Sequence, residues 1–537
     1  MSHSLKTNLI PVVKKYLNII QVPFTKKYIA AQLLQNPHYP TLYSISHLFG
    51  KYNLPSQAFE LEKDQLALLE PPFITYYNGP STGKDFIVVT DMNDAAVTFY
   101  DDGEKARTVD RRQFLQNWER IVMVAEPSAA SKEPGYEKHR QKEWKERLKT
   151  YGLATGAALI ILLLIVNLYA TAGAINPVIN TLILCTKMTA IAVTILLLLY
   201  DYDKTNSFVK NICTAGKQTG CDAVVNSNAG KIFGIKWSEA GFLYFASTFL
   251  FLLYPGITLA DKIPLLAIAA TAVSPYILFS IYYQAKIAKQ WCPLCLATQF
   301  ILLAELVWSY IAFWQSPIPV HLSLVVIAAL IACILLPVVA WFSIKRKLYE
   351  AKDAIQYEAA YKRLLYNPEH FNQLLQQQQD AAAGWQQLGI DMGNPEAEIT
   401  IIKVCNPYCG PCAKAHPVLE QLISENKNIK LKIIFTASNE ENDRAKEPVK
   451  HLLAIAEYDG RQQAEKALDD WYLAEKKNYE LFASMYPKNG ELAKQTGKID
   501  AMKDWCMKAS ITHTPTFFIN GKRLPETYRI EELKNIF

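Results

Sequence analysis

The first third of this 537-residue chain contains no cysteine, and all ten cysteines lie from Cys185 onward. Thiol chemistry is therefore excluded from the N-terminal part. The chain also lacks a large excess of one charge, since 56 basic residues against 50 acidic ones leave a net charge of +6. The basic residues lie mostly beside apolar runs rather than among exposed aromatic residues, which argues against a nucleic-acid partner.

The opening residues, MSHSLKTNLIPVVKKYLNII, hold no clean apolar stretch and no small-residue cleavage site. We therefore expect no cleavable signal peptide. Hydrophobic residues nevertheless make up 50% of the chain. A chain of this length and apolar content predicts several domains, one of them in lipid.

Six apolar runs between Gly152 and Ile344 are long enough to cross a bilayer, which takes about 20 residues each. An even number of spans places both termini on one face of the membrane, together with every candidate redox cysteine except Cys185 and Cys333. These two stand alone in apolar helices, where packing explains them. The predicted spans are 152–174, 178–200, 239–260, 263–284, 291–314 and 320–343.

Residues 1–130 have the pattern of a compact α+β domain. Helical periodicity covers Ile10–Leu34 and Tyr43–Phe49, and strand-like runs follow at Phe86–Thr90 and Ala96–Tyr100. The remaining chain is predicted to form a basic juxtamembrane helix, an all-α membrane bundle, a helical linker and an α/β domain, over residues 131–150, 151–344, 345–384 and 385–537.

Two cysteine pairs have two intervening residues: Cys292 with Cys295 at the mouth of an apolar helix, and Cys409 with Cys412 in the C-terminal part. This spacing brings two sulfurs together on the first turn of a helix, where unpaired N–H groups and the helix dipole stabilise a thiolate. A thiolate is the nucleophile of disulfide exchange. Zinc ligation or simple core packing would use the same residue type. Zinc usually needs two such pairs in one small domain, so we favour redox chemistry and expect no metal.

The loop after the second predicted span carries Cys213 and Cys221, and Cys221 begins the run Cys-Asp-Ala-Val-Val-Asn-Ser, followed by Phe-Gly. With the cysteine pair that opens the fifth span, this order of motifs over residues 178–314 resembles the vitamin K epoxide reductase family. The resemblance implies a membrane quinone as electron acceptor. It also implies a shuttle pair, Cys213 and Cys221, and a quinone-proximal pair, Cys292 and Cys295.

The same resemblance places Ser227, Phe233 and Gln299 at the quinone. Gln299 stands where the human enzyme has a tyrosine, so specificity for vitamin K or its epoxide is not implied, and the chain has an extra apolar span before the usual first one. Lys187 and Glu305 are ionisable residues within the predicted spans, where charge is costly. We expect them to form a structural pair, and the alternative is that they line the quinone pocket.

The strand-like run Ile399–Val404 leads into the second cysteine pair, and Thr514-Pro515 precedes the last strand-like run. Over residues 385–537 this pattern resembles the thioredoxin fold, and Glu441–Lys494 resembles the helical insertion of its bacterial disulfide-oxidase branch. The resemblance implies an exposed nucleophile, a resolving thiol and a cis proline beside a peptide groove. The corresponding residues are Cys409, Cys412, Thr514 and Pro515.

Lys403 stands six residues before Cys409, where thioredoxins usually carry a buried acid. A cation near the thiolate would lower the thiol pKa and make the pair more oxidising. The alternative is that Lys403 reaches solvent and has no effect. Cys405 and Cys506 either form a structural disulfide or are buried thiols.

Residues 8–127 are similar to the C39 peptidase domains of peptide-exporting transporters, which implies a papain-like α+β fold. The run Pro40–Leu54, the segment Asp85-Phe-Ile-Val-Val and the Phe114-x-x-x-Trp118 spacing carry this resemblance. That family uses a cysteine nucleophile and a histidine base. Here no cysteine exists and Asp85 replaces the histidine, so we expect no peptidase activity. The remaining groove is expected either to bind a cysteine-bearing peptide or to be purely structural.

Two arguments about membrane orientation conflict. The basic stretches Lys132–Lys149 and Lys345–Lys347 place the cysteine face in the cytoplasm by the positive-inside rule. Protein disulfides persist in oxidising compartments, which places the same face outside. Folded domains near spans can mask the charge effect, so we favour the periplasmic face of a bacterial inner membrane.

The leading hypothesis is a membrane thiol oxidase that passes electrons from protein or peptide thiols through the three cysteine pairs to ubiquinone or menaquinone. One alternative is a non-catalytic, peptide-binding accessory of a peptide-exporting ABC transporter, in which the cysteines are structural. Another keeps the enzyme but reverses the electron flow, so that quinones or disulfides are reduced.

Overall fold

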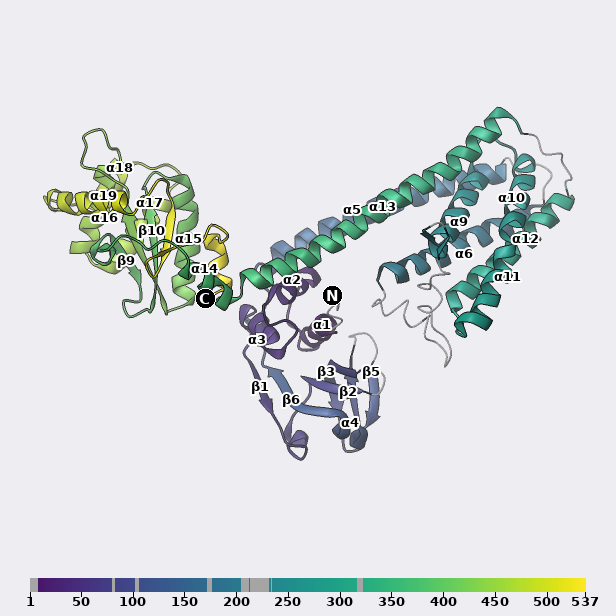
Figure 1. The fold of residues 1–537 in the computed structure, drawn as a ribbon, viewed down its shortest axis with the longest axis horizontal. Helices are drawn as coiled ribbons and strands as arrows, with labels where there is room; N and C mark the ends of the chain where they lie inside the picture. Colours follow the sequence, from purple (N-terminus) through teal and green to yellow (C-terminus); the bar gives the residue numbers. More distant parts are fainter. Residues whose placement is uncertain are drawn as a thin grey trace. The chain divides into compact units, whose positions relative to one another are not determined.

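The computed structural model describes residues 8–79, 83–101, 106–170, 176–203, 212, 231–232, 234–315 and 322–537 (Figure 1). Three domain-sized parts follow one another along the chain, two built around β-sheets and one, between them, almost entirely helical. Four residues that were predicted to act in the membrane part lie outside the described residues: Cys213, Cys221, Ser227 and Phe233.

The N-terminal part is built on a six-stranded antiparallel sheet with strand order β1-β6-β2-β3-β4-β5. Its apolar face forms a core with Phe73, Val89 and Phe114. The helical pattern predicted over Ile10–Leu34 is divided between two helices, because the chain turns at Gln21, which has a φ of 59°. The elements are α1 (Leu9–Ile19), α2 (Lys26–Gln35), α3 (Leu42–Lys51), β1 (Ser56–Glu60), β2 (Phe73–Gly79), β3 (Gly83–Met92), β4 (Ala96–Tyr100), β5 (Ala106–Asp110), α4 (Arg111–Asn117) and β6 (Trp118–Ala125).

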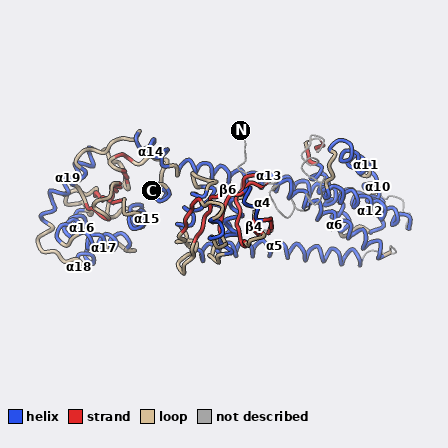
Figure 2. Tube along the Cα trace, turned by 90° about the horizontal axis from the view of Figure 1, so that it is seen from below, coloured by secondary structure: helices blue, strands red, loops and turns tan. Residues whose placement is uncertain are grey.

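The middle part consists of apolar helices, and Figure 2 draws it almost wholly in the colour of helices. The predicted juxtamembrane helix and first span form one continuous helix, and the last span continues into the charged linker in the same way. The helices are α5 (Tyr136–Ala170), α6 (Pro177–Tyr202), α9 (Trp237–Leu253), α10 (Leu259–Val273), α11 (Pro275–Tyr282), the π-helical η3 (Tyr283–Ala288), α12 (Pro293–Gln315) and α13 (Leu324–Leu365), with the short strands β7 (Lys231–Ile232) and β8 (Ile235–Lys236) before α9.

The prediction of six spans is wrong: among the described residues, five helices are long and apolar enough to cross a membrane. The exception is α9, whose 17 residues extend about 26 Å, short of a hydrocarbon core of about 30 Å. Pro255 and Gly256, which has a φ of 83°, follow its last turn, and proline cannot continue a helix. The long helices therefore do not support an even number of spans. The inference that both termini lie on one face of the membrane rested on that even number.

The C-terminal part is a five-stranded mixed sheet with strand order β13-β12-β10-β11-β9, in which β10 and β11 are parallel and joined through α15. Three α-helices, α16 to α18, lie within the predicted insertion Glu441–Lys494, and α19 follows it before β12. The elements are α14 (Pro368–Gln376), β9 (Ile390–Gly393), β10 (Ile399–Cys405), α15 (Gly410–Glu425), β11 (Ile429–Phe435), α16 (Lys446–Tyr458), α17 (Arg461–Leu473), α18 (Tyr479–Met485), α19 (Thr496–Lys508), β12 (Thr516–Ile519) and β13 (Lys522–Arg523).

Candidate redox sites

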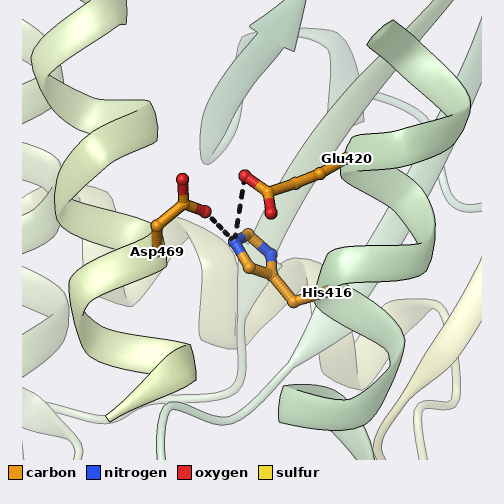
Figure 3. Close-up of side chains that lie close together, drawn as sticks. All are labelled: His416, Glu420 and Asp469. Atoms are coloured by element: carbon orange, nitrogen blue, oxygen red, sulfur yellow. Dashed lines mark hydrogen bonds and ion pairs between the residues drawn. The ribbon is translucent and has the colours of Figure 1, made fainter. Parts of the chain in front are cut away.

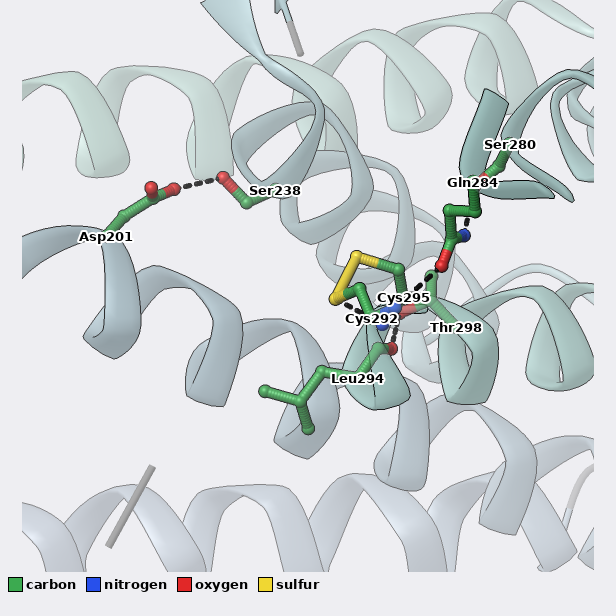
Figure 4. Close-up of a disulfide and its surroundings, with 8 residues drawn as sticks. All are labelled: Asp201, Ser238, Ser280, Gln284, Cys292, Leu294, Cys295 and Thr298. Atoms are coloured by element: carbon green, nitrogen blue, oxygen red, sulfur yellow. Dashed lines mark hydrogen bonds between the residues drawn. A yellow bond between two sulfur atoms is a disulfide. The ribbon is translucent and has the colours of Figure 1, made fainter. Parts of the chain in front are cut away.

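Cys292 and Cys295 form a disulfide at the start of α12 (Figure 4). Cys292 is fully buried, and its sulfur accepts a hydrogen bond of 3.2 Å from the backbone N–H of Cys295. The backbone N–H of Cys292 donates to the side-chain oxygen of Gln284, a buried residue in the π-helical turn η3. A backbone N–H group at the start of α12 therefore donates to a cysteine sulfur, as the spacing of the two cysteines predicts.

A cavity of about 190 Å³ lies beside this disulfide, between α6, α9, α11 and α12. Cys295 and Gln299 line it from α12. Gln299 is buried and its side chain interacts with the Tyr276 hydroxyl, but its amide nitrogen and oxygen form no hydrogen bond of regular geometry with the described residues. Six of the other fifteen lining residues are aromatic: Trp237, Tyr244, Phe245, Tyr276, Phe279 and Tyr283.

Lys187 on α6 and Glu305 on α12 form the predicted ion pair, and each side chain is only 1% exposed. The Lys187 ammonium also donates to the hydroxyl of Thr248 at 2.6 Å. Tyr244 joins the pair to the cavity, because its ring lines the cavity while its hydroxyl donates to Glu305 at 2.9 Å. The structure therefore shows the expected ion pair, whereas neither Lys187 nor Glu305 lines this cavity itself.

The second cysteine pair lies where β10 leads into α15. Cys409 is the N-cap residue, and its sulfur accepts a hydrogen bond of 3.4 Å from the backbone N–H of Cys412 and donates to the carbonyl of Thr514 at 3.3 Å. The peptide bond between Thr514 and Pro515 is cis, as predicted. The carbonyl that precedes the cis proline therefore faces the more exposed sulfur.

The two thiols differ in acidity. Burial raises the pKa of Cys409, but interactions with Cys412 and Thr514 and the charge of Lys403 outweigh it, so that this pKa lies below its ordinary value. Burial, with Cys405 and Cys409 as further causes, raises the pKa of the fully buried Cys412. This asymmetry favours Cys409 as the thiolate, while the roles of nucleophile and resolving thiol stay predictions.

Lys403 is completely buried in β10, so the alternative that it reaches solvent is wrong. Its ammonium group makes no hydrogen bond to any residue that the structure describes, and it lies 4.3 Å from the ring centroid of Tyr472. The Tyr472 hydroxyl lies 3.0 Å from the sulfur of Cys405. Burial lowers the pKa of Lys403, and the sulfurs of Cys405, Cys412 and Cys409 oppose that shift. Cys405 and Cys506 are both buried free thiols, which excludes the predicted alternative of a disulfide in this structure.

A cluster that was not predicted from the sequence contains His416 and Glu420 of α15 and Asp469 of α17 (Figure 3). The Nε2 atom of His416 lies 2.9 Å from Asp469 and 3.9 Å from Glu420. Burial, with Lys403 as the next cause, lowers the pKa of His416 to about 4, whereas burial and Asp469 raise that of Glu420 to about 8. The spacing of four residues on one helix signalled the first two residues, but nothing local signalled Asp469, which comes from α17.

These three residues offer metal-ligand atoms within 4.8 Å of one another. The nearby Lys403 lowers the pKa of both His416 and Glu420 by its positive charge. A divalent cation would meet the same repulsion if Lys403 is protonated, so the cluster is better suited to holding a proton than a metal.

In the N-terminal part, the side chain of Asn8 at the start of α1 bonds to the backbone N–H and C=O of Phe86 and to the carbonyl of Asp101. It therefore fixes β3 directly beside Asp85, the residue that replaces the histidine of the resembled family. Neither Asn8 nor Asp85 supplies a thiol or an imidazole. The absence of peptidase activity stays a prediction.

Comparison with known families agrees with this division of the chain. Residues 19–130 match the peptidase C39 family, residues 181–310 the vitamin K epoxide reductase family, and residues 386–537 a thioredoxin family. No curated protein matches the chain.

Solved structures with similarity to this chain include a periplasmic thioredoxin-like protein from Salmonella enterica serovar Typhimurium, with 12% identity, a TM-score of 0.23, and coverage of 28% of this chain and 90% of that one. Oxidised BdbD from Bacillus subtilis has 13% identity and a TM-score of 0.23, and the match covers 29% of this chain and 93% of that one. Proteus mirabilis ScsC in a compact conformation has 16% identity and a TM-score of 0.25, and the match covers 37% of this chain and 93% of that one.

The fold and the two cysteine sites define the class: a multi-pass membrane protein that carries thiol-disulfide chemistry. This chain contains a vitamin K epoxide reductase family domain, a C-terminal thioredoxin-like domain and an N-terminal peptidase C39 family domain. The first two domains indicate a membrane thiol-disulfide oxidoreductase.

Proposed function

We propose that the protein oxidises protein or peptide thiols and passes the electrons to a membrane quinone. The observation that carries this proposal is the position of Cys295, which belongs to a disulfide and also lines an aromatic cavity. The buried amide of Gln299 in the same wall interacts with the Tyr276 hydroxyl, and its donor and acceptor atoms form no regular hydrogen bond within the described part of the chain. A quinone, with an apolar ring and two carbonyl oxygens, fits such a wall. When bound, it supplies an acceptor for two electrons and two protons.

The chain's own residues account for the remaining steps. A substrate thiolate attacks the Cys409 sulfur of the Cys409–Cys412 disulfide, which forms a mixed disulfide and releases Cys412 as a thiol. A second substrate thiol then displaces Cys409, so that the substrate leaves as a disulfide and the enzyme pair is left as a dithiol. The reduced Cys409–Cys412 pair then passes two electrons to Cys213 and Cys221, and these pass them to Cys292 and Cys295. Each exchange converts one dithiol into a disulfide and one disulfide into a dithiol, so that electrons and protons balance.

Single cysteine variants test this route in the full-length protein. With a dithiol peptide and a short-chain quinone, Cys292→Ala and Cys409→Ala are expected to abolish quinone-dependent peptide oxidation. Cys333 is a buried cysteine in α13. The Cys333→Ala variant is therefore the matched control and should retain turnover. Full turnover of either redox variant would contradict the relay.

The direction of flow is a separate part of the proposal. The lowered pKa of Cys409 stabilises the reduced pair relative to its disulfide and so favours an oxidising couple. Equilibration of the Cys409–Cys412 pair with glutathione buffers, read by mass spectrometry, measures its reduction potential. A potential as low as that of thioredoxin, about −270 mV, would favour the reductase alternative.

The N-terminal domain would bind the peptide or protein that carries the substrate cysteines, in line with its peptidase C39 family match. Its sheet and α1 are held together at Asn8 without a catalytic thiol. Crosslinking of a cysteine-bearing export peptide to the full-length protein should locate contacts within residues 8–127. Contacts confined to the C-terminal domain would instead indicate a structural role.

A further inference from the structure

Two ion pairs reach the cavity beside Cys295, each through a hydroxyl group. We call Lys187–Glu305 the inner pair and Lys236–Asp201 the outer pair. Tyr244 donates from the cavity wall to Glu305, and Ser238, which also lines the cavity, donates to Asp201. Figure 4 shows Ser238 turned toward Asp201 near the disulfide. In both cases a hydroxyl group of a cavity-lining residue donates to a carboxylate that forms an ion pair with a lysine.

The two pairs differ in their access to water. Both side chains of the inner pair are 1% exposed. In the outer pair the carboxylate of Asp201 is 6% exposed and the Lys236 side chain 24% exposed, with 2.9 Å between them. The outer pair therefore reaches the surface of the helix bundle through Lys236, whereas the inner pair lies wholly inside the bundle.

No charged side chain lines the cavity in the part of the chain that the structure describes. Negative charge that develops in this apolar space would have no counter-charge on the wall and would be costly. A proton must therefore accompany electron transfer. The two hydroxyls that connect the wall to ionisable groups are suited to deliver it.

We propose that Tyr244 and Ser238 are the proton donors for reduction of a quinone in this cavity, with the inner and outer pairs as their proton sources. This inference rests on the proposed function. The thiols of Cys292 and Cys295 form one S–S bond and release two electrons and two protons. Two electrons and two protons are taken up at the two quinone oxygens, one proton from each hydroxyl. The ammonium groups of Lys187 and Lys236 reprotonate the hydroxyls through the carboxylates of Glu305 and Asp201, and the two protons released by the thiols restore the ammonium groups.

The test uses the full-length protein in lipid nanodiscs, a dithiol peptide and a short-chain quinone. Tyr244→Phe and Ser238→Ala are each expected to lower kcat roughly 10- to 100-fold, at the modest end of general acid catalysis, and to increase the solvent deuterium isotope effect. The affinity for the quinone, measured in the absence of dithiol by quenching of tryptophan fluorescence, should remain within about twofold of the unsubstituted value, a change of about 0.4 kcal/mol.

Tyr310→Phe is the matched control, because Tyr310 lies on α12 and bonds to Thr271 without lining the cavity. It should leave kcat, affinity and the isotope effect unchanged. Unchanged kcat in both test variants, or a loss of kcat explained by an equal loss of quinone affinity, would overturn the inference. Failure of the unsubstituted protein to reduce the quinone would instead overturn the proposed function itself.

Discussion

At the scale of single residues, the buried Lys403 acts on the second cysteine pair. Its positive charge lowers the pKa of Cys409. Replacement by methionine, which keeps the apolar stem, should therefore raise the Cys409 pKa and make the pair less oxidising. The pH dependence of Cys409 alkylation in the reduced full-length protein, read by mass spectrometry, measures this.

Lys432→Met provides a control for that substitution. Lys432 is a buried lysine in the neighbouring strand β11, but it is bonded to Asp391 at 2.8 Å and to the carbonyl of Leu388. It should leave the alkylation profile of Cys409 unchanged. An unchanged profile in Lys403→Met would mean that Lys403 is a neutral amine over the working pH range.

Glu420 gives the C-terminal domain a distinct pH dependence. Its folded-state pKa of about 8 lies above the ordinary value of 4.5. The stability that it contributes is complete below pH 4.5 and is lost as the pH rises through 8. Glu420→Gln should therefore flatten the loss of stability between pH 5 and 8, whereas the exposed Glu425→Gln on the same helix should not. Pulse proteolysis of the full chain, scored on C-terminal fragments, measures this.

His416 affects the stability of the C-terminal domain at acidic pH. Its folded-state pKa of about 4 lies below the ordinary value of 6.5. Its contribution is present above pH 6.5 and is lost as the pH falls through 4. The same proteolysis series in the Glu420→Gln background should still show this acid loss. A profile that stays flat on both sides would contradict the assignment of the two shifts.

At the scale of helices, the inner pair joins α6 to α12 inside the bundle. Removing one partner leaves the other charge buried and unpaired, which costs about 3–5 kcal/mol. Lys187→Met and Glu305→Gln should each lower the stability of the detergent-solubilised protein, and the double variant should recover most of the loss. Unfolding titrations in SDS measure this. Additive losses in the double variant would show that the two side chains act independently.

At the scale of the whole molecule, the proposed function predicts the side of the membrane on which Cys409 lies. The proposed oxidation of exported thiols places it outside. In a Cys412→Ala variant, intact cells should label Cys409 rapidly with a membrane-impermeant maleimide. Cys409→Ser in the same background controls for other thiols. Labelling only after lysis would place the second cysteine pair in the cytoplasm, as the basic flanks predict.

The sequence by itself determined the three-domain organisation, the two Cys-x-x-Cys helix starts and the helical insertion of the C-terminal domain, because local spacing and periodicity encode each of them. It did not determine that Lys403 is buried, which depends on β10 being covered on both faces. Nor did it determine the length of α9 or the cluster around His416.

Only the tertiary structure decided which residues meet. Glu305 and Tyr244 are 61 positions apart in the sequence, and His416 and Asp469 are 53 apart. Glu305 and Tyr244 meet because α9 and α12 both pack against α6, and His416 and Asp469 meet because α15 packs directly against α17. No local sequence pattern records either relation. The spacing of the cysteines thus predicted the redox-active pairs. The packing of α6, α9 and α12 decided which ionisable groups lie near the Cys292–Cys295 pair.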